Sequence, residues 1–520
     1  MSSPTPPQLL IHNRFIAFLI WQSITSSSIF LLFKLLTIPT QPFLLSLLTF
    51  LAFQFSQFIF SLSLSFLSSP KHCSPLSPLQ LSYAFIRFLF VSGDSFSSLD
   101  FRRRFYLSLR LILFLLAASF SGFLSLVCAS GFCDFRGFGF GFVYGLLYVY
   151  FHRWVLEFPI IQRPPFYSFK MKLPLAVKQA FKLSSSVYLC SSVLLAFLPN
   201  HFNSYVTLRK FITEQIILFS GSFSMFICWE LSHHLHQVLH TKRFVFAPPK
   251  WSAAAETNPS EPLLAALEES TPGSLPQYLA YLDLCMVCEN NVDTWRRAAF
   301  FEETGETYKR VVAVCLQPLE HLASTVAEGF ESQSVDKAYQ QLNQLQPQND
   351  LQLDPKCYEP LNNFQQFAWC ARTAAFLTVR SHTEDRFGVA QLSGSNAAVI
   401  STLLSCLLAA EALMGKKTNL QTSHQLMGPG GIKWATPNTV RREIVVVKKI
   451  SGPLYSKAYA IADVLKTSIY SIVSAFHDEM LASEKAGHLH KDWLISGKPL
   501  FGNNELLLQK LRLFLDFRAS

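Results

Sequence analysis

The stretch that decides the fold opens with FIAFLIWQSITSSSIFLLF at residues 15–33 and FLLSLLTFLAFQFSQFIFSLSLSF at residues 43–66. Neither segment contains a charged residue. A bilayer core about 30 Å thick requires roughly 20 apolar residues in a helix, because unpaired backbone amides cannot be left in hydrocarbon. The two segments therefore predict membrane-spanning helices.

Apolar segments of this kind recur as far as residue 231. The six segments predicted to span a membrane cover residues 15–33, 43–66, 111–128, 138–158, 183–198 and 211–231. The loops after the second and fourth segments, and the tail after the sixth, carry far more Lys and Arg than the opposite loops. Because short cytoplasmic loops retain basic residues, both termini are expected to face the cytoplasm.

Composition and charge divide the chain of 520 residues into two halves. Residues 1–250 carry 20 Lys and Arg against 6 Asp and Glu, whereas the remainder carries 24 against 28. The net charge of +10 therefore belongs to the membrane half and favours attraction to anionic cytoplasmic-leaflet lipid. The second half lacks the basic groove of nucleic-acid modules, so direct nucleic-acid binding is not expected.

We predict an all-α chain in four parts. Residues 1–14 form a cytoplasmic lead, residues 15–243 a six-helix transmembrane domain, and residues 244–276 a linker rich in Pro, Ala, Ser and Glu. Residues 277–520 show apolar positions at three- and four-residue spacing, which predicts a mainly α-helical cytoplasmic or pore-facing domain.

Three glycines, Gly137, Gly141 and Gly145, recur at four-residue spacing in the fourth predicted span. On a helix they form a smooth stripe along which a second helix can pack closely. An equally weighted alternative is that glycines in this region mark a tight lumenal turn before the span.

A histidine cluster follows the sixth predicted span. His233, His236 and His240 share one helical face near Glu230, and imidazoles so placed can bind a transition metal. Membrane di-iron enzymes need further histidine groups that this sequence does not supply, so the favoured interpretation is an interfacial helix with its rings at headgroup level. No metal, cofactor or catalytic site is predicted.

Cys285 and Cys288 form a lone Cys-x-x-Cys on a predicted helix. A zinc site needs two more ligands at motif spacing, and a redox pair needs a preceding strand. The favoured interpretation is a pair of core residues.

The local sequence YLAYLDLCMVCENNVDTWRRAAFFEETGETYKRVV, residues 278–312, resembles the nuclear-division-cycle type of transmembrane nucleoporin. The likeness lies in a helix, a short turn, Arg-Arg and an aliphatic-Phe segment leading into the next helix. The predicted order of six spans, linker and helical domain also resembles that family. The compact cytoplasmic half and a Gln-rich insertion near residue 340 depart from it.

The resemblance implies a structural protein without enzymatic activity, located in the pore membrane of the nuclear envelope. Its implied partners are the bilayer and soluble scaffold, linker and WD-repeat nucleoporins. Two sets of candidate partner contacts follow from aromatic, Arg and apolar residues: Trp295, Arg296, Arg297, Phe300 and Phe301, and then Leu507, Leu511 and Phe514 of the C-terminal helix. The first set can equally be core packing beside a solvated Arg pair.

Two other functional classes compete with this scaffold hypothesis. A lipid-modifying enzyme of the endoplasmic reticulum membrane would need the histidine cluster as a metal site, and full function after replacing His233, His236 and His240 would exclude it. A transporter would usually show ionisable groups deep in the membrane or broken helices, which the sequence does not indicate.

Overall fold

The computed structural model describes residues 6–37, 42–90, 99–130, 135–196, 208–249, 251–342, 360–414 and 453–519. The regular structure of this part of the chain is helical, and its extended backbone makes one isolated parallel bridge, between Ser69 and Val155. Two compact units are present. Unit 1 consists of Met1–Arg243 with Gly273–Pro276, and unit 2 of Phe244–Pro272 with Gln277–Ser520.

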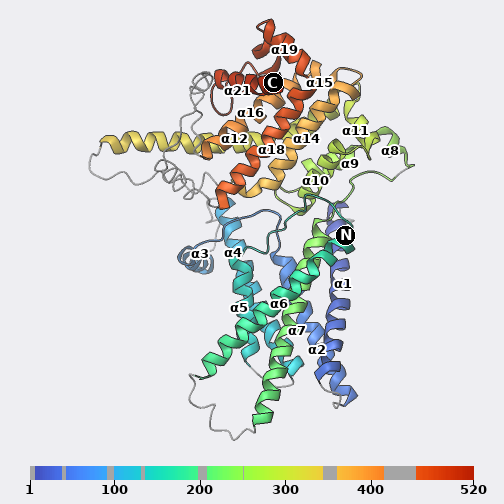
Figure 1. Ribbon diagram of the computed structural model, residues 1–520, viewed down its shortest axis with the longest axis vertical. Coiled ribbons are helices and arrows are strands. Elements are labelled where there is room, and N and C mark those ends of the chain that lie inside the picture. The colour runs from blue at the N-terminus through green and yellow to red at the C-terminus, as the bar shows by residue number, and fades with distance from the viewer. Residues whose placement is uncertain are drawn as a thin grey trace, which may run out of the picture. The chain divides into compact units, whose positions relative to one another are not determined.

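Unit 1 is built from long apolar helices (Figure 1). Its helices in the described chain are α1 (Pro6–Thr37), α2 (Phe43–Leu67), α3 (Pro78–Phe90), α4 (Leu99–Ser130), α5 (Arg136–Tyr150), α6 (Pro165–Ala196) and α7 (Leu208–Thr241). Four of them, α1, α2, α4 and α7, are long and apolar enough to cross a membrane, and they contain four of the six predicted spans.

The other two predicted spans are not among the described helices that are long and apolar enough to cross a membrane. Helix α5 has only 15 residues and ends at Tyr150, because His152 adopts a left-handed backbone conformation (φ 51°) that a helix cannot continue. At 1.5 Å per residue it is about 22 Å long, which is short of the bilayer core. Of the span predicted at residues 183–198, residues 183–196 form the last 14 residues of the 32-residue α6 and the rest lies outside the described residues; the part of α6 before residue 183 carries four lysines.

The ends of the helices in unit 1 are tied to one another. Arg14, near the start of α1, donates a hydrogen bond to the carbonyl oxygen of His240, near the end of α7 (2.6 Å). The backbone N–H of Arg243, just after α7, donates to the side chain of Gln162, just before α6 (3.2 Å). The starts of α1 and α6 therefore lie at the same end of unit 1 as the end of α7.

The ends of α2 and α5 and the start of α4 also lie at this end of unit 1, so successive long helices run in opposite directions. The bridge between Ser69 and Val155 joins the residues that follow α2 and α5. Arg104, near the start of α4, donates to the carbonyl oxygen of Ser74, which also follows α2 (3.2 Å). Gln237, near the end of α7, donates to the carbonyl oxygen of Val155 (3.0 Å) and so links this group to the first.

We call this end of unit 1 the basic end. The basic residues that it carries include Lys71, Arg87, Arg102, Arg103, Arg104, Arg153, Arg163, Lys170, Lys172, Lys242 and Arg243. The far ends of the helices carry Lys34, Arg136, Arg209 and Lys210. The fold thus gathers at one end the basic residues of loops that are far apart in the sequence.

Aromatic side chains fill the core of unit 1. The rings of Phe60 on α2 and Trp229 on α7 stack with centroids 4.5 Å apart, and Tyr144 on α5 packs against Trp229 at 4.9 Å. All three side chains are buried. The outward faces of α1 and α2 instead expose large apolar residues, as expected for helices that meet lipid.

Helix α3 lies against the first turns of α4. Ala84 of α3 packs with Phe105 of α4, and both are buried. The opposite face of α3 exposes Leu79, Tyr83 and Ile86, which recur at helical spacing. This arrangement agrees with an amphipathic helix lying in the membrane interface.

Unit 2 is a separate helical domain (Figure 1). Its helices in the described chain are α8 (Ala253–Thr257), α9 (Glu261–Glu268), α10 (Leu275–Glu289), α11 (Thr294–Ala298), α12 (Glu306–Leu342), α14 (Phe364–Glu384), α15 (Val389–Leu392), α16 (Ser395–Leu413), α18 (Pro453–Ala475), α19 (His477–Lys485), α20 (Leu489–Trp493) and α21 (Asn504–Ala519). Short 3₁₀ turns are present at Ala299–Phe301 and Pro360–Asn363.

Helix α16 is the central helix of unit 2. It packs against α12, α14 and α18, and nearly all of its side chains are buried. By length and hydropathy it also qualifies as a membrane span. Because its neighbours are the other helices of unit 2, we assign it instead to the core, where a helix that is apolar on every side is expected.

The segment predicted as a linker is folded for most of its length. Residues 244–272 belong to unit 2 and contain α8 and α9. Leu263, Leu264 and Leu267 of α9 are buried, and Arg310 of α12 forms ion pairs with both ends of α9 at Glu261 and Glu268. The Pro and Ser content of this segment therefore marks short helices and turns.

Candidate functional site

A polar cluster lies inside unit 1 near its basic end. The carboxylate of Glu230 on α7 is completely buried, and Arg153, in the turn after α5, donates to both of its oxygens at 2.7 Å. The left-handed backbone conformation of His152 follows the end of α5 at Tyr150 and places Arg153 beside Glu230. A buried carboxylate requires this kind of charged, hydrogen-bonded partner.

Two tyrosines of α5 complete the cluster. The hydroxyl of Tyr144 donates to Glu230 (3.2 Å). The hydroxyl of Tyr148 lies 3.1 Å from the carbonyl oxygen of Arg153 and 3.0 Å from Nδ1 of His233. Tyr144 and Tyr148 are four residues apart and so share the face of α5 that meets α7.

The other histidines of α7 also pack against side chains within unit 1. The rings of His236 and His240 stack with centroids 3.9 Å apart, and Phe18 of α1 packs edge-on against His236 at 5.1 Å. His233, His234, His236 and His240 are all buried. The rings therefore pack between the helices of unit 1, and their predicted position at headgroup level stays a prediction.

The geometry of the histidines does not suit a metal ion. Among the described residues, no group of three or more His, Cys, Asp or Glu side chains is placed to hold one. His233 is directed to Tyr148 on α5, whereas His236 lies 3.4 Å from the hydroxyl of Ser68 after α2. His233 thus faces α5, whereas His236 and His240 stack on each other against Phe18 of α1, so the three rings do not converge on one point.

The polar cluster is arranged to join helices. Each charged or polar group in it contacts an element other than its own, and Gln237 adds bonds to the backbone of Val155 and Glu157. No activated nucleophile or open position for a substrate lies in the arrangement, as far as the described residues go. The polar cluster therefore has a structural role, which is to hold the end of α5 against α7.

The glycine stripe lies against α4. A Cβ atom built on Gly141 would lie 2.2 Å from the carbonyl oxygen of Ala118, and one on Gly137 would lie 2.8 Å from that of Gly122. Gly145 meets Leu115 at 2.9 Å. All three positions therefore allow the backbones of α4 and α5 to approach closely.

In unit 2, the Arg pair predicted as a partner contact lies in the interior. Arg296 is 1 % exposed and donates to the fully buried carboxylate of Asp283 (2.7 Å) and to the carbonyl oxygen of Phe246 (2.9 Å). The backbone N–H of Phe246 also donates to Asp283 (2.9 Å). Arg296 and Asp283 together hold the segment before α8 against α10 and α11.

Arg297 joins different elements. It is 1 % exposed, donates to both oxygens of Glu384 at the end of α14 (2.6 and 2.8 Å), and caps the end of α10 through the carbonyl oxygen of Asn290 (2.9 Å). Phe300 and Phe301 are buried as well. Of the first set of candidate contacts, Trp295 alone remains exposed, at 38 %.

The second set of candidate partner contacts, on α21, contains both buried and partly exposed residues. Leu507 and Leu511 are buried, whereas the half-buried Phe514 lines a surface groove between α18 and α21. This groove, which we call the α18–α21 groove, has a volume of about 400 Å³ and is lined by Lys466, Thr467, Tyr470, Lys510, Leu513, Phe514 and Phe517. The sequence did not indicate the exposed residues Tyr470, Leu513 and Phe517, because their exposure depends on how α18 and α21 pack.

The Cys-x-x-Cys pair is part of the core of unit 2. Cys285 and Cys288 are buried, together with Cys315 and Cys370. Exclusion of water raises the pKa of the Cys285 thiol to about 12, with Glu289 adding to the effect and Arg372 opposing it. Thiols held in the neutral form are poor nucleophiles and poor metal ligands.

The cluster in unit 1 could be predicted only in part. Glu230 and the histidines are conspicuous in an apolar segment, but Arg153 and Tyr144 come from sequence about 80 residues away. A signal was present in Arg153 itself, since an arginine near the end of an apolar segment needs a partner. We compared the chain with models of known protein families and with curated proteins, and neither comparison found a match.

Proposed function

We propose that this chain is a transmembrane nucleoporin, a non-enzymatic multi-pass protein that anchors the nuclear pore complex in the pore membrane. In this role it binds soluble scaffold, linker and WD-repeat nucleoporins and supports pore assembly, on which mRNA and protein transport depend. The nuclear-pore location rests on the resemblance of residues 278–312 to the nuclear-division-cycle family.

The observation that carries the anchoring role is the arrangement of unit 1. Its apolar helices alternate in direction, and the contacts of Arg14 and Gln162 bring the ends of the first and last helices to one basic end. Basic residues are retained on the cytoplasmic side of a membrane. The proposed orientation therefore has the basic end, and the chain that continues from Arg243 into unit 2, on the cytoplasmic or pore side.

The interior of unit 2 favours a scaffold role. Arg296 and Arg297 are both used to tie helices and connecting segments together. Two surface grooves of unit 2, one along α12 and one between α18 and α21, have linings that do not converge on a catalytic group. A domain whose interior is fixed by buried ion pairs and whose surface carries grooves is suited to binding segments of partner proteins.

The α18–α21 groove is the proposed partner site. Tyr470, Leu513 and Phe517 supply an apolar floor, and Lys466 and Lys510 flank it. Both lysines pair with the single carboxylate of Glu411 (3.5 and 2.8 Å), which leaves one positive charge in excess. The proposed occupant is an amphipathic helix of a soluble nucleoporin that carries acidic residues beside its apolar face.

Imaging tests this proposal directly. The C-terminus is tagged and imaged at high resolution in cells together with a pore-scaffold marker. Coincidence with pores at the nuclear rim is the expected result. A diffuse reticular or plasma-membrane distribution would overturn the proposed location.

A further inference from the structure

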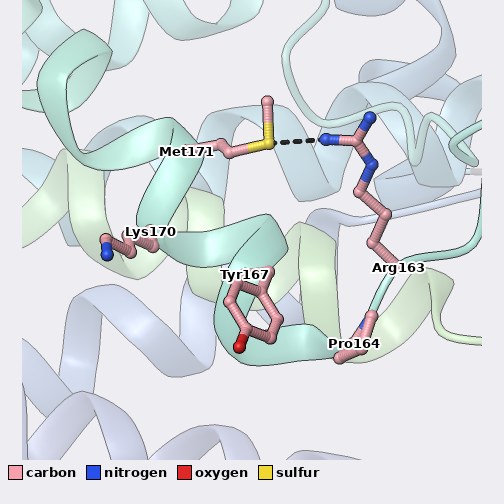
Figure 2. A pocket seen from close by; sticks show the side chains of 5 residues that line it. All are labelled: Arg163, Pro164, Tyr167, Lys170 and Met171. Atoms are coloured by element: carbon pink, nitrogen blue, oxygen red, sulfur yellow. Dashed lines mark hydrogen bonds between the residues drawn. The ribbon is translucent and has the colours of Figure 1, made fainter.

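We propose that the start of α6 binds the headgroup of an anionic phospholipid that carries a phosphate monoester. The site is a cavity of about 520 Å³ at the basic end, lined by Arg163, Pro164, Tyr167, Lys170 and Met171 (Figure 2). The proposal requires only that unit 1 lies in a membrane, and it does not depend on the nuclear-pore location.

Charge is the first argument. The cavity lining contains two cations and no carboxylate. Within the described chain, the side-chain hydrogen bond of Arg163 goes to the sulfur of Met171, at 2.8 Å. Figure 2 shows these two side chains facing each other, with Lys170 and Tyr167 on the first turns of α6.

A thioether sulfur is a weak acceptor, so most of the donor capacity of the Arg163 guanidinium is left for a ligand. A guanidinium fork matches the oxygens of a phosphate group, and an ammonium supplies a second point charge. Figure 2 shows the Lys170 ammonium and the Tyr167 hydroxyl pointing away from the Arg163 guanidinium, so they act at the rim of the cavity and not at one shared point. Tyrosine is typical of the membrane–water interface.

The apolar surroundings identify the ligand as a lipid. Met171 of the lining is 64 % exposed, and large apolar side chains near the lining residues in sequence are also strongly exposed: Ile160 is 89 % exposed, Ile161 67 % and Phe166 70 %. A free phosphate in water makes no use of such a surface. The acyl chains of a membrane lipid cover it when the headgroup occupies the cavity.

The position within unit 1 agrees with this assignment. Gln162, next to Arg163, accepts a hydrogen bond from the backbone of Arg243 after α7, which fixes the segment at the basic end. Headgroups lie at the ends of membrane helices, so the cavity and its apolar rim are at the depth where a lipid phosphate and the first part of its acyl chains meet.

Retention of lipid by the full-length protein tests the proposal. The protein is placed in phosphatidylcholine nanodiscs that contain phosphatidylinositol 4-phosphate, and protein-bound lipid is measured by native mass spectrometry. We expect the double variant R163Q/K170Q to retain this lipid about tenfold less. R163K, which keeps the charge and loses the fork, should be intermediate.

A matched control carries the same change in charge on the same helix. Lys178 and Lys182 are exposed on α6 outside the cavity. We expect K178Q/K182Q to change retention by no more than about twofold, since only the screened, non-specific attraction is reduced. Equal losses in both double variants would mean general attraction to the basic end and would overturn the site.

A competition experiment separates lipid from free phosphate. Soluble inositol 1,4-bisphosphate, the headgroup without acyl chains, is added in excess to the wild-type protein. The lipid proposal predicts that the bound phosphatidylinositol 4-phosphate remains. Complete displacement would show that the cavity recognises a soluble phosphate compound, and the lipid assignment would be wrong.

Discussion

Arg153 and Glu230 form a bidentate ion pair in which the Glu230 side chain is fully buried and the Arg153 side chain is 19 % exposed. The pair joins the turn after α5 to α7. Since both partners end up in the apolar interior of unit 1, removal of either one leaves a charge without compensation.

Replacing Arg153 with methionine tests this relationship. We expect the free energy of unfolding to fall by about 3 kcal/mol, because the Glu230 carboxylate would remain buried without its partner. Thermal unfolding of the full chain in detergent measures the effect. The control Arg87→Met removes an exposed arginine of α3 and should change stability by less than about 0.5 kcal/mol. Similar losses in the two variants would contradict a specific role for the ion pair.

The glycine stripe of α5 makes a position-specific prediction. Gly141→Ala places a methyl group 2.2 Å from the backbone of Ala118, so α4 and α5 must separate, at a cost of about 1–3 kcal/mol. Gly139 lies on the same helix, and a Cβ atom at that position would have no neighbouring atom within 4 Å. Gly139→Ala should therefore be neutral or stabilising, by up to about 1 kcal/mol. The prediction fails if thermal unfolding gives the two variants the same stability.

Asp283 is the matching test in unit 2. Asp283→Asn removes the buried partner of Arg296, and we expect unfolding to become easier by about 3 kcal/mol. Glu306 pairs with Lys309 on the exposed surface, so Glu306→Gln should cost less than about 1 kcal/mol. Limited proteolysis and thermal unfolding of the full chain report both effects. An Asp283→Asn protein as stable as Glu306→Gln would show that Arg296 does not depend on this carboxylate.

The buried thiols predict a dependence on pH. The pKa of Cys285 is raised to about 12 from an ordinary value near 9, so the folded state keeps this proton after the unfolded chain has lost it. The thiol therefore makes stability fall as the pH rises from about 9 to about 12, and has no effect below that range.

Alkylation measures the same property at each cysteine. With iodoacetamide at pH 8, we expect Cys285 and Cys288 to remain unmodified in the folded chain and to react in denaturant. Mass spectrometry of peptides reports each position separately. Rapid modification of Cys285 in the folded chain would contradict its place in the core.

The α18–α21 groove provides a test of partner binding. Phe517 is 73 % exposed, so Phe517→Asp should leave unit 2 folded while weakening the capture of soluble scaffold nucleoporins about tenfold or more. Phe387 is also exposed and lies outside the groove, so Phe387→Asp is the matched control. Co-purification from cells, with the candidate nucleoporins quantified, gives the comparison. Unchanged capture by Phe517→Asp would remove the groove from the proposal.

Local pattern predicted the helical class and four of the membrane helices. Uncharged segments such as residues 43–66 specify a spanning helix through length and hydropathy alone, which are properties of a single segment. Length and hydropathy alone do not distinguish α16, a core helix of unit 2, from a membrane-spanning helix. Hydropathy does not record whether lipid or other helices surround a segment. The end of α5 was also missed, since it depends on the backbone conformation of His152.

The sequence by itself determined the charge division, the apolar segments, the glycine spacing and the presence of ionisable residues within apolar stretches. Only the tertiary structure decided what these residues contact. Arg153 meets Glu230, and Arg296 and Arg297 lie in the core of unit 2 with Asp283 and Glu384. The physical reason is that a charge can be buried only where a distant part of the chain supplies a partner, and a one-dimensional pattern does not contain that pairing.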